Sequence, residues 1–119
     1  MNVNERSPGL VGALTYRATY AEEAVHEPNL ARRTAMIRQV RLLKRLLEPS
    51  FDASCSAFPD LDTIPSPVRQ KLDELLDSIL HDLEPMKDVP LGTINRTAKR
   101  RVSTKSREFI MQLENLIRA

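Results

Sequence analysis

Residues 93–118 read TINRTAKRRVSTKSREFIMQLENLIR, the longest segment of the chain with an unbroken helical pattern. Its apolar side chains recur at helical spacing and fall on one stripe about 100° wide. The members of that stripe are Ile94, Ala98, Val102, Phe109, Leu113 and Leu116. No proline or glycine interrupts the stretch. The spacing therefore predicts one long helix over 93–118, with Thr93 as its N-terminal cap.

The first half of this helix is strongly cationic, because six of the fifteen residues 95–109 are Lys or Arg. Arg96, Arg100 and Arg107 lie opposite the apolar stripe, whereas Arg101 and Lys105 lie near its edge. A cationic first turn opposes the helix dipole by about 0.3–1 kcal/mol. We therefore expect an acidic surface to face this block, such as the acidic segment 67–84.

Two further segments carry the same apolar periodicity. The stripe of residues 29–48 consists of Met36, Val40, Leu43 and Leu47. The stripe of residues 67–84 consists of Leu72, Leu76, Ile79 and Leu83. Asn29, the first residue of 29–48, is a suitable N-terminal cap. Ser66 precedes the second segment and can cap it through its hydroxyl, and Pro67 fits the first helical position. Both segments are predicted helices.

A fourth helix is predicted over 8–26, after the pair Ser7-Pro8. Gly9 and Gly12 weaken its start, since glycine disfavours helix. The sequence leaves open whether this helix packs firmly. We expect residues 1–7 to be flexible and residues 49–66 to form a connection that contains several prolines. The whole chain, 1–119, then makes a single all-α domain of about four helices.

Composition limits the class of protein. Only five aromatic side chains occur in 119 residues, so the core must be aliphatic. The single Cys55 cannot form an internal disulfide, and no spacing of Cys and His predicts a metal site. Nothing Gly-rich could hold a phosphate, and no nucleophile stands in a recognised motif. These patterns favour a non-catalytic protein without cofactors that lies in the cytoplasm, and no apolar run is long enough to span a membrane.

The charge pattern leaves a nucleic-acid-binding regulator open as an alternative. Two predicted helices present arginine-rich faces, one of which carries Arg38, Arg41 and Arg45. Such faces can neutralise phosphates. However, the net charge is only +2, and the few aromatics argue against a surface on which bases stack. Direct nucleic-acid binding is therefore the less favoured hypothesis.

Broad apolar helix faces in a short chain favour contact with a second chain. Three helices carry such faces, and exposed contiguous apolar area is typical of protein interfaces. We therefore predict a homodimer that also binds a protein partner. The candidate interface residues are Leu42, Leu46, Arg38, Arg45, Arg100, Arg107 and Met111.

Three segments carry a resemblance to a known family. They are LARRTAMIRQVRLLKRLLEPSF, SPVRQKLDELLDSILHDLEP and TINRTAKRRVSTKSREFIMQLENLIRA, which cover about three fifths of the chain. Together they resemble the QslA-type family of small anti-activators of bacterial quorum sensing. The resemblance implies an all-helical homodimer without catalytic activity. It also implies a partner, the ligand-binding domain of a LuxR-type transcription activator, whose dimerisation surface the protein would occupy.

Overall fold

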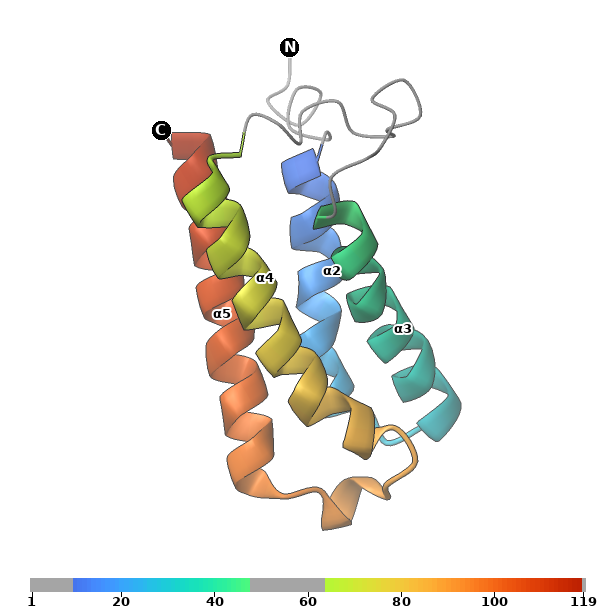
Figure 1. Cartoon of the computed structure of the whole chain (residues 1–119). Helices are drawn as coiled ribbons and strands as arrows, with labels where there is room; N and C mark the ends of the chain where they lie inside the picture. The colour runs from blue at the N-terminus through green and yellow to red at the C-terminus, as the bar shows by residue number, and fades with distance from the viewer. Residues whose placement is uncertain (1–9, 48–63, 119) are drawn as a thin grey trace.

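The computed structural model describes residues 10–47 and 64–118, and these residues form four α-helices (Figure 1). The helices are α2 (Leu10–Ala24), α3 (Leu30–Leu47), α4 (Ser66–Leu83) and α5 (Arg96–Arg118), with two 3-10 turns, η3 (Glu84–Met86) and η4 (Leu91–Thr93). No strand occurs in the described part, so the all-α prediction is confirmed. The predictions for residues 1–7 and for most of the connection 49–66 lie outside the described residues.

The four helices form an up-and-down bundle in which each runs opposite to the previous one (Figure 1). α2 packs against α3 and α5, and α4 packs against the same two helices. α3 and α5 therefore occupy diagonal corners. The short turn between α2 and α3 explains their antiparallel arrangement, since a link of a few residues places consecutive helices side by side.

The predicted apolar stripes meet along the axis of the bundle. Fully buried side chains from all four helices include Leu14, Ile37, Val40, Leu43, Leu72, Leu76, Leu83, Phe109 and Leu113. Each such side chain contributes about 1.5–3 kcal/mol through removal of apolar surface from water. As composition predicts, this interior is mainly aliphatic, and Phe109 is the one aromatic side chain in the buried core of the described residues.

The first helix packs firmly against the bundle, a point that its sequence left open. Ala18, Ala21 and Ala24 are buried together with Leu14, and α2 contacts both of its neighbours closely. Alanine has no long side chain to hold a neighbouring helix away. A stripe of alanines is therefore a weak sequence signal for a buried helix face, because alanine is small, although it allows close helix packing.

The helix starts confirm one predicted cap and correct two. Asn29 Oδ1 accepts a hydrogen bond from the amide of Arg32 at 3.0 Å, as predicted. Thr93 is not the cap of α5, because its hydroxyl donates to the Pro90 carbonyl at 2.8 Å. Asn95 caps α5 instead. Ser66 is itself the first residue of α4, which follows Pro65 and has no side-chain cap.

Asn95 Oδ1 accepts from the backbone amides of Thr97 at 2.7 Å and Ala98 at 3.3 Å. The residue before it, Ile94, is extended and 7% exposed. Burial of this side chain separates the turn η4 from α5. The helix therefore begins at Arg96, two residues after the position at which a Thr93 cap would place its start.

Arg33 is buried in the first turn of α3, with no exposed surface. Its Nε and Nη2 donate to the Glu27 carbonyl at 3.0 and 2.8 Å. Its Nη1 donates to the Met86 carbonyl at 2.7 Å and to the Val89 carbonyl. The guanidinium thus joins the turn after α2 to the turn after α4. Sequence reasoning assigned no role to this arginine.

We expect Arg33→Ala to lower the free energy of unfolding by about 3 kcal/mol or more, since each buried acceptor left unsatisfied costs about 1–3 kcal/mol. Urea denaturation followed by circular dichroism measures this change. The neighbouring Arg32 is exposed, so Arg32→Ala serves as the control and should change stability by less than about 0.5 kcal/mol. Equal stability of the two variants would show that the carbonyl contacts of Arg33 contribute little.

Candidate functional site

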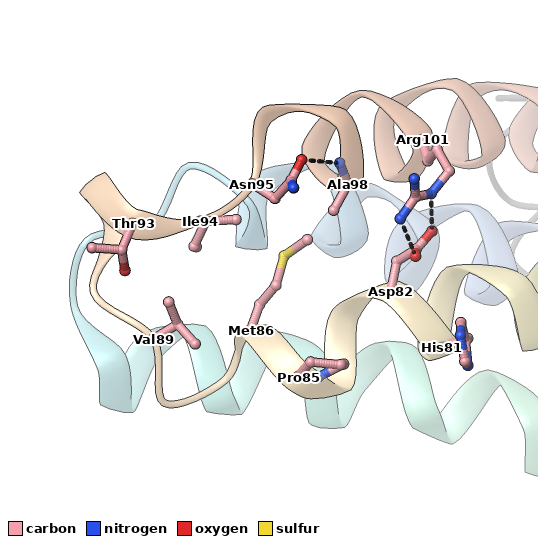
Figure 2. A pocket seen from close by; sticks show the side chains of 10 residues that line it. All are labelled: His81, Asp82, Pro85, Met86, Val89, Thr93, Ile94, Asn95, Ala98 and Arg101. Carbon is pink, nitrogen blue, oxygen red and sulfur yellow. Dashed lines mark hydrogen bonds and ion pairs between the residues drawn. The ribbon is translucent and has the colours of Figure 1, made fainter.

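The inner edge of the cationic block, Arg101 and Lys105, faces α4, which confirms the expected acidic neighbour for this edge. Arg101 binds Asp82 through two hydrogen bonds, Nη2 to Oδ1 at 2.9 Å and Nε to Oδ2 at 3.2 Å (Figure 2). Lys105 approaches the same carboxylate at 3.7 Å and donates to the hydroxyl of Ser78. The Asp82 side chain is 7% exposed. The hydrogen bond from Arg101 holds the pKa of Asp82 below its ordinary value, although burial acts in the opposite direction.

A second set of ion pairs joins α3 to α4. Lys44 Nζ lies 2.7 Å from Asp73 Oδ1 and 2.8 Å from Asp77 Oδ1. Arg41 pairs with Glu84, which follows the end of α4. Hydrogen bonds from Lys44 to Asp73 and Asp77 raise the pKa of Lys44. The stability they contribute is therefore present below pH 10.5 and is lost as the pH rises through the higher folded-state pKa.

The cations that remain on α3 form its outer surface. Arg38 and Arg45 are exposed, and neither makes an ion pair or a hydrogen bond with any other described residue. Leu42 lies between them on the same stripe of the helix and is half-buried. We call Arg38, Leu42 and Arg45 the α3 outer surface. Leu46, the fourth predicted residue of this helix, is half-buried and packs against the core.

The other three predicted residues lie together on α5. Arg100, Arg107 and Met111 fall within about 40° of arc, and we call them the α5 outer surface. Met111 is 57% exposed, and Arg100 is exposed without an ion pair to another described residue. Arg107 binds Glu22 of α2 at 2.9 Å, but its side chain remains 73% exposed. A pair this exposed contributes about 0–1 kcal/mol, so Arg107 stays accessible to a partner.

The structure therefore divides the predicted site into two surfaces. Because α3 and α5 occupy diagonal corners, α2 and α4 separate the α3 outer surface from the α5 outer surface (Figure 1). This separation cannot be predicted from the helical stripes, since two stripes can lie on adjacent or on diagonal helices of a bundle.

Sequence reasoning also missed an aromatic side chain on α2. Tyr16 is 60% exposed, its ring packs edge-to-face on that of Tyr20 at a centroid distance of 5.4 Å, and the two hydroxyls are 2.9 Å apart. The position of Tyr16 opposite the alanine stripe is the signal that could have identified it.

The described residues hold no group of three or more His, Cys, Asp or Glu side chains that could bind a metal ion. Among them, no helix has both the length and the apolar character needed to cross a membrane. Comparison with protein-family models, with curated proteins and with solved structures finds no match for this chain.

We expect the contribution of Asp82 to the free energy of unfolding to disappear at acidic pH. A folded-state pKa below the ordinary 3.8 means that the carboxylate stabilises the fold above that pH and loses its effect as the pH falls through the lower value. Asp82→Asn should therefore lower the unfolding free energy by about 1–2 kcal/mol at pH 7, and this difference should shrink below pH 3.8.

Thermal unfolding of both proteins between pH 2 and pH 7 measures the difference. Asp88 is exposed, so Asp88→Asn is the matched control and should leave stability almost unchanged at every pH. A constant gap between wild type and Asp82→Asn across this range would contradict a role for the charged carboxylate.

Proposed function

We propose that the protein is a non-catalytic regulator that binds and sequesters a LuxR-type quorum-sensing activator in the cytoplasm. It would occupy the surface through which the activator dimerises, and so keep the activator from DNA. The resemblance of three segments to QslA-type anti-activators supports the partner class. The helical bundle with outward cationic and apolar residues supports binding to another protein.

The observation that carries this proposal is the difference between the two sides of α3. On the side that faces α4, Arg41 and Lys44 are neutralised by carboxylates of the same chain. On the outer surface, Arg38 and Arg45 flank Leu42 without any such partner among the described residues. Arginines beside a leucine suit a partner surface with an apolar centre and acidic edges. The charges would orient the partner, and the apolar contact would supply affinity.

We assign homodimerisation to the α5 outer surface. Met111 is one of three large apolar side chains that are exposed in the described part. Its unbranched thioether adapts to many neighbouring shapes. In a two-fold dimer the same patch contacts itself, so one exposed apolar residue can contribute twice. This assignment leaves the α3 outer surface accessible to the activator.

The test of sequestration uses a purified LuxR-type activator and its promoter DNA. We expect an excess of the wild-type protein to abolish the activator's gel shift, and Arg38→Glu/Arg45→Glu to need at least about tenfold more protein for the same effect, because two charge reversals oppose an acidic partner. The control, Lys87→Glu/Arg96→Glu, reverses two exposed charges elsewhere and should act like wild type.

If the activator still dimerises and binds its promoter with the wild-type protein in excess, sequestration is wrong. The same gels test the alternative function. Tight binding of random duplex DNA by this protein alone, with a steep loss between low and moderate salt, would favour a nucleic-acid-binding regulator.

Light scattering tests the dimer separately. We expect the wild-type protein to be dimeric in the micromolar range and Met111→Lys to shift it toward monomer, because the substitution places two like charges in a self-complementary contact. Leu30 is also exposed and apolar, so Leu30→Lys is the control and should remain dimeric. If the wild-type protein is monomeric throughout this range, the proposed homodimer is wrong. The gel-shift experiment still tests sequestration separately.

A further inference from the structure

A cavity of about 380 Å³ opens at the end of the bundle, where α4 ends and α5 begins (Figure 2). Its apolar wall is made by Met86, Val89, Ile94 and Ala98, which come from the turns between the two helices and from the first turn of α5. Its volume is at the lower end of the range of about 300–1,000 Å³ that is usual for ligand pockets. The cavity is therefore large enough for a short aliphatic chain.

Two contacts already described hold the walls of this cavity in place. Arg33 binds the backbone carbonyls of Met86 and Val89, whose side chains line the cavity. Asn95 caps α5 and so determines where Ala98 lies. A ligand would meet a wall that is already ordered, so that little conformational entropy is lost on binding.

The polar side of the cavity offers donors. Both oxygens of Asp82, which lines the cavity, are engaged by Arg101, so this carboxylate is already neutralised by a cation of the same wall. Nη1 of Arg101 makes no hydrogen bond to another described residue. The Oδ1 atom of Asn95 is used by the helix cap, which leaves its amide N–H groups as donors. In Figure 2 this nitrogen lies on the Met86 side of the residue.

We propose that this cavity binds a small aliphatic carboxylate. The head would accept hydrogen bonds from Arg101 Nη1 and from the Asn95 amide, and the chain would pack on Met86, Val89 and Ile94. The unused donors select the class of ligand: a carboxylate can accept from both, an ammonium group accepts no hydrogen bond, and a neutral alcohol accepts a weaker one. The site lies apart from the residues proposed for activator binding, so it does not depend on that function.

The experiment is a titration of the full-length protein with sodium hexanoate, followed by amide chemical shifts in NMR spectra. We expect saturable shifts at Val89, Ile94 and Ala98 with a dissociation constant in the millimolar range, which suits so small a ligand. Hexanol and hexylamine have the same chain length with a neutral and a cationic head. Both should bind at least about tenfold more weakly, because neither offers an anionic acceptor to Arg101 and Asn95.

A matched pair of variants tests the role of Asn95. Aspartate is as good a helix cap as asparagine, so Asn95→Asp should keep the fold while it replaces the amide donor with a second carboxylate. We expect hexanoate affinity to fall at least about tenfold. Asn115 is exposed on α5, about 30 Å along the helix, and Asn115→Asp makes the same chemical change there and should leave affinity unchanged.

Three results would overturn the proposal. Binding of hexanol with the same affinity as hexanoate would show that the cavity recognises the apolar chain alone. Equal affinity of wild type and Asn95→Asp would remove the amide from the binding site. Shifts confined to Ala18 and Ile110, which line a different groove between α2 and α5, would place binding elsewhere.

Discussion

The buried guanidinium of Arg33 is the contact on which one end of the bundle depends. Removal of a charge from water costs several kcal/mol unless hydrogen bonds replace its hydration. Here the carbonyls of Glu27, Met86 and Val89 supply those bonds. Glu27 follows the end of α2, and Met86 ends the turn that continues α4, so the guanidinium extends from the first turn of α3 to the negative ends of these two other helices. Two turns far apart in the sequence are thereby held together.

This contact has a consequence for the proposed binding cavity. The carbonyls that bind Arg33 belong to residues whose side chains form the cavity wall. Stability at the end of the bundle and the shape of the cavity therefore depend on the same hydrogen bonds. On the opposite wall, the Asn95 cap both starts α5 and leaves an amide donor. In each case a backbone requirement of the fold also positions a group that can bind a ligand.

The charged side chains fall into two groups: those that pair with a neighbouring helix and those that face outward. Asp82 and the acids that surround Lys44 neutralise cations of the neighbouring helices, so much of the alternating charge along the sequence is used within the bundle. Arg38, Arg45 and Arg100 are left facing outward. They lie on two diagonal helices, which favours two separate protein contacts over one continuous basic surface for nucleic acid. We propose the α3 outer surface as the contact with the activator and the α5 outer surface as the contact between two copies of this chain.

The sequence by itself determined the helices, because apolar spacing depends only on neighbours a few residues away. It identified the core stripe of α5, the cap at Asn29, and the inward edge at which Arg101 and Lys105 meet α4. Only the tertiary structure decided that α2 packs closely, that Arg33 is buried and that the predicted interface residues divide between two corners. The physical reason is that these features depend on which elements meet. The buried Arg33 is recognisable only when the fold brings to it the carbonyls of Met86 and Val89, which are more than fifty residues away in the sequence.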